Sequence, residues 1–331
     1  MLGYLARRLL DYAVMTAVAT SLGYVAAVSV LHPADRLLQA TPRPTPAQVQ
    51  ARLADFGLDP SATVWERYGQ WAQGVLTRWD WGLSPDGTPI GSEFLTRALV
   101  SGRLVVIATV LQIVLGVALG VFAASRQYRL GDRAVTTLSY LLACLPAPVA
   151  FLWVQLGGIA VNEAAGRRLV YVSGLSAAVP PSGVGARIAD AAAHLALPTI
   201  ALTLVGYGSY QLLQRAVLLD EIGSDYVRAA RAKGLRRGQA IRRHAVRVSC
   251  VPVAQNIAFT LPAVFAGTFV LEQVFAWEGL GRYLIEAVTA TQDVNAVAAS
   301  IAFGGALFAV GAIIADSCVA VIDPRARRRA P

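Results

Sequence analysis

Six long apolar runs constrain this chain more than any other feature of its sequence. Each is close to the roughly 20 residues that an α-helix needs to cross a bilayer. They extend over Tyr12 to Leu31, Leu104 to Ala124, Ala134 to Val161, Leu195 to Gln211, Cys250 to Phe275 and Ala296 to Ile322. Lipid offers backbone amides no hydrogen-bonding partner, so we expect every run to be helical. The sequence predicts an all-α polytopic membrane protein with six transmembrane helices, and a charged fraction of only 15% fits that class.

Prolines interrupt two of these runs. Pro146 and Pro148 lie at the middle of the third run, and Pro262 lies in the fifth. Proline removes a backbone donor and clashes with the preceding turn, so both helices are expected to be kinked or broken. Such a break either lines a pathway or is a packing kink between helices.

The first run follows Arg7 and Arg8, a pattern that also occurs in cleaved signal peptides. Its length of 20 residues favours a retained helix instead. Six spans put both termini on one side of the membrane. If that side is the cytoplasm, 18 of the 29 Lys and Arg residues lie on short cytoplasmic segments, nine of them between Arg215 and Arg247. We therefore predict cytoplasmic termini, and the net charge of +9 is interpreted as a topology signal rather than a nucleic-acid footprint.

The three cysteines and three histidines give no metal or disulfide motif. The cysteines lie in or beside apolar runs and are interpreted as small buried side chains, and the histidines are scattered. No phosphate-cradling glycine loop and no nucleophile motif occur in the chain. The sequence therefore predicts a protein that is not an enzyme and that binds neither a metal nor a cofactor itself.

Two stretches are predicted to lie outside the cell. Residues 32–100 are expected to form a small extracytoplasmic cap, in which Thr45 caps a helix that has Pro46 at its first position and ends at Gly57. Residues 162–193 are interpreted as a loop with a short ordered piece. The first stretch carries an aromatic cluster formed by Trp65, Tyr68, Trp71, Trp79 and Trp81. This cluster either lies at the membrane interface or in a small core, or it forms a docking surface for a partner.

A basic segment separates the fourth and fifth runs. Asp225 to Ala245 contains seven Lys and Arg residues against one carboxylate. Good helix formers interrupted by Gly234 and Gly238 predict two short helices, Asp225 to Lys233 and Arg237 to Val246. Three alanines give the first helix a small face that can enter a groove. The alternative is a basic helix that rests on anionic lipid.

The residues of this loop resemble those of a known family. DYVRAARAKGL followed by RRHAVRVSCVPV is similar to the cytoplasmic coupling loop of ABC importer permeases of the peptide and nickel family. The general permease motif is Glu-Ala-Ala-x-x-x-Gly, and Arg228, Ala229, Ala230 and Gly234 occupy those positions, so the glutamate is replaced. The B-type subunits of peptide importers also resemble FGLD, ERYGQWAQGVLTRWDWGLS, VYVSGLS, HLALPTIALTL, VLEQVFAWEGLGRYLIEAV and DPRAR elsewhere in the chain.

The resemblance implies a type I ABC importer permease fold and a role in ATP-driven peptide import. It implies a heterodimer with a second homologous permease, one or two cytoplasmic ATPases that hold ATP and Mg²⁺, and an extracytoplasmic peptide-binding protein. The location implied is the bacterial plasma membrane. The implied ATPase contact consists of Asp225, Tyr226, Ala229, Ala230 and Gly234. The two alanines are expected to form the face that fits against the ATPase.

The expected organisation has four parts. Residues 1–31 form the N-terminus and first helix, 32–100 the extracytoplasmic segment, 101–322 the permease core with a coupling loop at 217–249, and 323–331 a basic cytoplasmic tail.

Three polar residues in the apolar runs are candidates for the translocation path. Glu272 and Gln273 lie near the outer end of the fifth run, and Asp316 lies in the sixth. The alternative for Asp316 is a hydrogen bond to a neighbouring helix. The sequence departs from the family at Glu278, where a proline is usual, so this turn is expected to differ in rigidity. A nickel-complex importer and an ATP-independent secondary transporter are the alternative functions.

Overall fold

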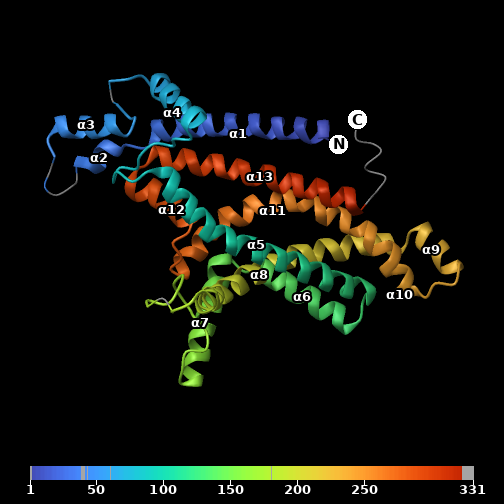
Figure 1. The fold of residues 1–331 in the computed structure, drawn as a ribbon. Helices are drawn as coiled ribbons and strands as arrows, with labels where there is room; N and C mark the ends of the chain where they lie inside the picture. The colour runs from blue at the N-terminus through green and yellow to red at the C-terminus, as the bar shows by residue number, and fades with distance from the viewer. Residues whose placement is uncertain (1, 39–41, 43, 60, 180, 323–331) are drawn as a thin grey trace. The chain divides into compact units, whose positions relative to one another are not determined.

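The computed structural model describes residues 2–38, 42, 44–59, 61–179 and 181–322. Within these residues the only extended pairing is a single bridge between Leu83 and Pro89, so the predicted all-α class is confirmed. The basic tail 323–331, with its DPRAR motif, lies outside the described residues. The elements in Figure 1 are α1 Leu2–Val30, α2 Pro33–Leu38, α3 Pro46–Asp55, α4 Val64–Arg78, α5 Ile90–Ser125, α6 Leu130–Cys144, α7 Ala147–Ala165, α8 Val184–Ile222, α9 Asp225–Ala232, α10 Arg237–Ala240, η1 Ile241–Ala245, α11 Val246–Val274, α12 Leu280–Glu286, η2 Ala287–Thr291 and α13 Val294–Ile322.

The long helices coincide with the apolar runs. Among the described residues, helices α1, α5, α8 and α13 are each long and apolar enough to cross a membrane. Helices α6 and α7 are apolar enough only as a pair, and the bend of 109° between them is that of a broken span or of a re-entrant loop. The fifth run lies in α11, which is 29 residues long. The helices extend past the apolar runs because polar residues that follow a span can continue its backbone hydrogen bonding in water.

The predicted break at Pro146 and Pro148 is confirmed. Helix α6 ends at Cys144 and α7 begins at Ala147, with Pro146 as the preceding cap residue and Pro148 in the first turn. Proline is tolerated there because the first amides of a helix have no partner within the helix. No break occurs at Pro262, since α11 runs through this position without interruption.

The chain forms two compact units. The first contains residues 1–102, 265–272 and 278–309, and the second contains residues 103–264, 273–277 and 310–331. Consequently α5, α11 and α13 each contribute to both units, and each unit is described separately below.

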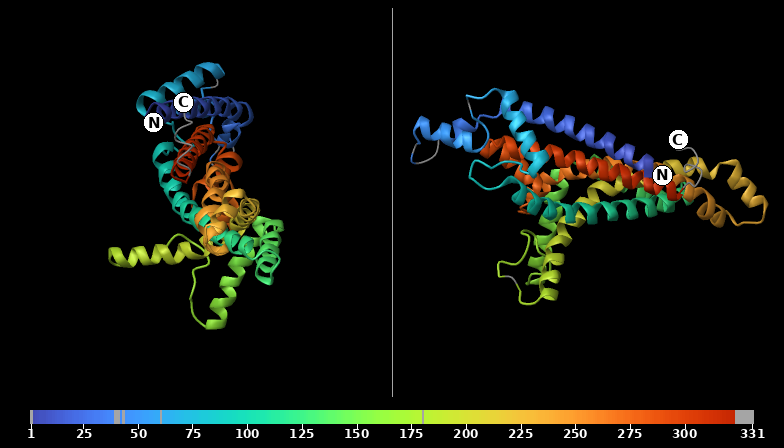
Figure 2. Two further views of the ribbon diagram at one scale, coloured as in Figure 1. Left: turned by 90° about the vertical axis from the view of Figure 1, so that its right-hand side faces the viewer. Right: turned by 45° about the horizontal axis from the view of Figure 1, so that its top comes forward.

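In the first unit, α1 and the first half of α13 run side by side, as Figure 1 and Figure 2 show. Gly23 and Gly305 allow a close approach: a Cβ atom on Gly305 would lie 2.7 Å from the Thr16 hydroxyl oxygen. The core of this unit also takes in α3 and α4. Tyr24 of α1 is fully buried and stacks on Trp71 of α4, with ring centroids 4.7 Å apart.

The helix predicted to begin at Pro46 and to end at Gly57 is confirmed as α3. Thr45 and Gln48 form a reciprocal capping box, and Pro46 is the first helical residue. Gly57 has a φ of +73° and ends the helix. Its N–H donates to the carbonyl of Ala54, and the N–H of Leu58 donates to that of Leu53, the pairing of a Schellman motif.

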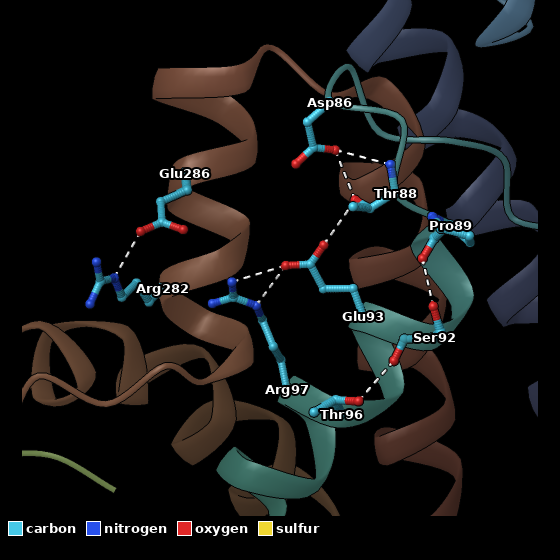
Figure 3. Close-up of polar contacts among 9 residues, drawn as sticks. All are labelled: Asp86, Thr88, Pro89, Ser92, Glu93, Thr96, Arg97, Arg282 and Glu286. Atoms are coloured by element: carbon cyan, nitrogen blue, oxygen red, sulfur yellow. Dashed lines mark hydrogen bonds and ion pairs between the residues drawn. The ribbon is translucent and has the colours of Figure 1, made fainter. Parts of the chain in front are cut away.

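The beginning of α5 carries a chain of polar contacts (Figure 3). The Thr88 hydroxyl donates to Asp86 at 2.8 Å and is 3.2 Å from a carboxylate oxygen of Glu93. Glu93 pairs with Arg97 one turn later at 2.9 Å, and the Arg97 guanidinium lies over the ring of Tyr283 in α12, 5.2 Å from its centroid. These contacts join α5 to α12 within the first unit.

In the second unit, α6 and α7 both pack on α8. The approach of α5 to α8 depends on Gly116 and Gly120, a small-xxx-small pair. A Cβ atom on Gly120 would lie 2.7 Å from the Cβ of Gln214, and one on Gly116 would lie 2.8 Å from the carbonyl oxygen of Tyr207. Closely packed α5 and α8 therefore position the loop that follows α8.

Candidate functional site

The basic loop begins directly after α8. Only Gly223 and Ser224 separate α8 from α9, and Ser224 has the extended backbone of a helix N-cap residue. Its hydroxyl donates back to the carbonyl of Glu221 at 2.7 Å instead of capping α9. Asp225 stands in the first turn of α9, where a negative charge interacts favourably with the helix dipole. The predicted start of this helix at Asp225 is confirmed.

Gly234 ends α9 through its backbone conformation. Its φ is +92°, in the region that favours glycine. The N–H of Gly234 donates to the carbonyl of Arg231 at 3.0 Å, and the N–H of Leu235 donates to that of Ala230 at 3.3 Å. These two bonds form a second Schellman motif. Gly234, predicted to interrupt the helical segment, is therefore a helix stop with a defined geometry.

One face of α9 is anchored in the second unit. Val227 and Ala230 are 2% and 8% exposed. They belong to a cluster that joins α5, α8, α9, α10 and η1, formed by Ala124, Leu218, Val227, Ala230, Ala240, Ile241 and Ala245. The expectation that both Ala229 and Ala230 face outward is thus wrong for Ala230, because successive side chains on a helix point about 100° apart and that of Ala230 lies on the anchored side.

The other face of α9 is free of the protein core. Asp225, Tyr226, Ala229 and Gly234 are all exposed. Asp225 pairs with Arg228, an exposed contact of the kind that contributes little to stability. The Tyr226 hydroxyl donates to the Glu221 carboxylate. Partial burial, together with this hydrogen bond, raises the pKa of Tyr226 to about 12, so the phenol is neutral at physiological pH.

The second predicted helix of the loop does not end at Val246. Helix α10 passes through the π-helical segment η1 directly into α11, so the segment from Arg237 to Val274 is continuous. Exposed cations cover the outside of the loop: Arg228, Arg231, Lys233, Arg236, Arg237, Arg242 and Arg243. The loop is therefore a small anchored structure with a basic surface.

Beneath the loop lies an ion pair that the sequence does not reveal. Asp132 at the start of α6 is 2% exposed and is held by two guanidinium contacts from Arg215 of α8, at 2.6 and 2.9 Å. The backbone N–H of Tyr128 donates to the same carboxylate at 2.9 Å. The sequence predicts that Arg215 lies in the cytoplasmic loop, because the fourth apolar run ends at Gln211. The continuation of α8 beyond that run places it inside the unit.

Glu272 is fully buried in the first unit. The Ser101 hydroxyl donates to its Oε1 atom at 2.5 Å, and the N–H of Arg282 donates to its Oε2 atom at 2.8 Å. The N–H of Leu280 donates in turn to the Ser101 oxygen at 2.8 Å. Ser101 and Glu272 together cap the N-terminus of α12, whose own cap residue, Gly279, has no side chain to do so.

The other two path candidates lie in the second unit. Gln273 is exposed, and Asp316 is half-buried in α13 and takes part in a polar or electrostatic interaction. Glu278, which stands where the family usually has proline, is exposed next to the buried Trp277. Among the described residues, no group of three or more His, Cys, Asp or Glu side chains is arranged to hold a metal ion.

Comparison of the sequence with known proteins identifies the family of this chain. The model of the binding-protein-dependent transport system inner membrane component matches residues 116–328, which include the whole loop and the Asp132–Arg215 pair. The chain belongs to this family. The permease family resemblance of the loop sequence is thereby confirmed, and so is the type I permease fold.

Curated relatives of this permease are similar over most of their length. The oligopeptide transport system permease protein OppB of Mycobacterium tuberculosis is 37% identical over 324 residues, which cover 98% of each chain. The dipeptide transport system permease protein DppB of Escherichia coli is 28% identical, with 84% of each chain covered. The oligopeptide permease AppB of Bacillus subtilis is 26% identical over 87% of this permease and 88% of AppB. The similarity therefore includes the segments before residue 116.

Proposed function

We propose that this permease is the membrane subunit of an ATP-driven importer of peptides. Its family membership and the peptide permeases among its relatives support this function. The observation that carries the mechanism is α9, a short helix whose inner face is anchored in the protein core and whose outer face is bare. Since the chain has no phosphate-binding glycine loop, ATP and Mg²⁺ are held by partner subunits and not by this chain.

In this proposal α9 is the contact with a cytoplasmic ATPase. Asp225, Tyr226, Ala229 and Gly234 form the outer surface that the ATPase receives. Ala230 acts from the inside, because its side chain fixes α9 on the core. A movement of α9 is therefore transmitted to α5 and α8 through packed side chains. In this way, movement of the ATPases changes the positions of the membrane-spanning helices α5 and α8.

The remaining partners follow from the same proposal. This permease pairs with a second homologous permease to form the path, and an extracytoplasmic binding protein delivers the peptide. Both termini and the basic loop lie on the cytoplasmic side of the bacterial plasma membrane, in agreement with the preference of Lys and Arg for that side. Gln273 and Asp316 are the proposed path residues, and transport by Gln273→Ala and Asp316→Asn in vesicles tests each of them.

The coupling role is tested by two glycine substitutions in one loop. At both Gly234 and Gly238 an added Cβ would meet no other atom within 4 Å, but only Gly234 has a positive φ, of +92°. A β-branched residue is strongly disfavoured there. We expect Gly234→Val to lower peptide uptake by proteoliposomes at least tenfold while the ATPase still co-purifies. Gly238→Val is the matched control and is expected to transport at close to the normal rate.

Normal uptake by Gly234→Val would contradict the role given to α9. Equal losses in both variants would point to damage of the loop as a whole. If neither variant binds an ATPase, and the unmodified permease also fails to bind one, the proposed function itself is wrong.

A further inference from the structure

Helix α4 presents three different faces. Its inner face packs on α1 through Tyr68 and Trp71. A polar face consists of Glu66, Gln70, Gln73 and Thr77, all exposed. A third face carries what we call the outer apolar stripe, formed by Trp65, Leu76 and Trp79, which are 71%, 85% and 75% exposed. The stripe is continuous because Gly69 and Ala72 fill the intervening positions at helical spacing.

Contacts with α1 fix the depth of α4. The Tyr68 hydroxyl lies 2.6 Å from the Ser21 hydroxyl, and Trp71 stacks on Tyr24. Val30 ends α1, so at 1.5 Å per residue Ser21 lies about 14 Å before that end and Tyr24 about 9 Å before it. Half of the hydrocarbon thickness is about 15 Å. Helix α4 therefore lies beside the half of α1 that ends at Val30, across the C-terminal part of α1 in Figure 1.

The exposed surface of α1 is apolar as well. α1 is apolar enough to cross a membrane, and Val14, Val18 and Leu22 are each more than half exposed. Side chains of this kind on a span face acyl chains. A helix that lies beside such a span and carries an apolar face next to a polar one has the pattern of a helix in a membrane interface.

The backbone of Trp79 also indicates a contact outside the chain. Trp79 ends α4 with a φ of +56°, a conformation that is uncommon for a bulky residue, and glycine is the usual occupant of such a helix end. Its ring makes an edge contact with Trp81, with centroids 5.4 Å apart, yet the side chain is 75% exposed. Burial within this chain does not offset the unfavourable backbone, so the benefit of a tryptophan here comes from a contact outside the chain.

We propose that α4 lies in the membrane interface on the side where α1 ends, with Trp65, Leu76 and Trp79 in contact with lipid. Tryptophan is suited to this place because its ring is apolar and its N–H is polar. The polar face of α4 is in water. This leaflet is the outer one in the orientation proposed above, but the depth of α4 along α1 does not depend on that orientation.

Paired cysteine substitutions test the proposal in the permease complex. In a background with Cys144, Cys250 and Cys318 replaced, Leu76→Cys reports on the stripe and Gln73→Cys on the polar face of the same helix. The complex is reconstituted into phosphatidylcholine–phosphatidylglycerol nanodiscs without any binding protein and is treated with a charged maleimide. We expect Leu76→Cys to react at least tenfold more slowly than Gln73→Cys. A nitrobenzoxadiazole dye on Leu76→Cys is expected to be quenched by spin-labelled lipid, and a dye on Gln73→Cys is not.

Equal reaction rates, with no quenching by lipid, would overturn the proposal. If Leu76→Cys reacts rapidly in nanodiscs and is protected only when a binding protein is added, the stripe is a protein docking surface and the proposal is also wrong. Trp65→Cys with Gln70→Cys provides a second pair, should either of the first two variants fail to assemble. Transport plays no part in this readout, so its result is independent of the coupling experiment.

Discussion

Replacement of Glu272 separates a packing role from a pathway role. Its carboxylate accepts hydrogen bonds from the Ser101 hydroxyl and from the N–H of Arg282, and Ser101 accepts one from the N–H of Leu280. These bonds hold the N-terminus of α12, because Gly279 provides no side-chain cap. We therefore consider Glu272→Ala and Glu272→Gln, which remove this support to different degrees.

The two substitutions differ in the groups that they leave without a partner. Alanine removes both acceptor atoms and leaves two buried donors unsatisfied, at about 1 to 3 kcal/mol each, so we expect about 3 to 4 kcal/mol of local destabilisation. Glutamine can accept from Arg282 through its oxygen and donate to Ser101 through its nitrogen. It loses the charge assistance of the carboxylate and the acceptor of the Ser101 O–H, and leaves one donor without a partner where alanine leaves two, at about 1 kcal/mol. The order of the two effects is therefore fixed by the geometry.

Hydrogen exchange of residues 278–286 measures this local stability in the reconstituted complex. Each 1.4 kcal/mol of opening free energy changes the exchange rate about tenfold. Glu272→Ala should accelerate exchange by about 100-fold or more, and Glu272→Gln by about five- to tenfold. Gln273→Ala, at the exposed neighbouring position, is the control without an expected effect. The reasoning is refuted if alanine accelerates exchange no more than glutamine does, or if Glu272→Gln abolishes transport while α12 keeps its protection.

Three further predictions concern the second unit. Arg215→Ala leaves the buried carboxylate of Asp132 without its cation and should lower stability by about 3 to 5 kcal/mol, measured by thermal unfolding of the purified complex; Asp132→Asn with Arg215→Gln should recover most of this loss. Gly120→Leu forces a side chain into α8 and should reduce the yield of folded protein, as seen by size-exclusion chromatography. Tyr226 should ionise with a midpoint of about 12 in absorbance difference spectra against Tyr226→Phe, because burial and the hydrogen bond to Glu221 favour the neutral phenol. The neutral Tyr226 phenol therefore stabilises the folded protein below about pH 10, and this stabilisation is lost as the pH rises through about 12. Unfolding measured across this pH range checks the loss.

Local signals in the sequence predicted much of the fold. Apolar run length located the spans, the proline pair located the break before α7, and Thr45 with Pro46 located α3. The start of α9 and its end at Gly234 were also predictable, since a capping position, a first-turn acid and a glycine stop act within a few residues of one another.

Contacts between distant residues could not be predicted from one sequence. Ser101 and Glu272 are 171 positions apart, and Asp132 and Arg215 are 83 apart, so no periodic pattern joins them. The inward side chain of Ala230 escapes prediction for a different reason. α9 has few large apolar residues, and adjacent alanines do not indicate which side of a short helix faces the core.

The length of α8 has a mechanical consequence. Its 39 residues form one continuous helix of about 58 Å, and only two residues separate it from α9. A rod of this length acts as a lever: a tilt of about 5° displaces its far end by about 5 Å, roughly one helical turn. Because α9 is joined to this lever by a short link and is packed on its end, small angular changes are converted into displacements comparable to the size of a side chain.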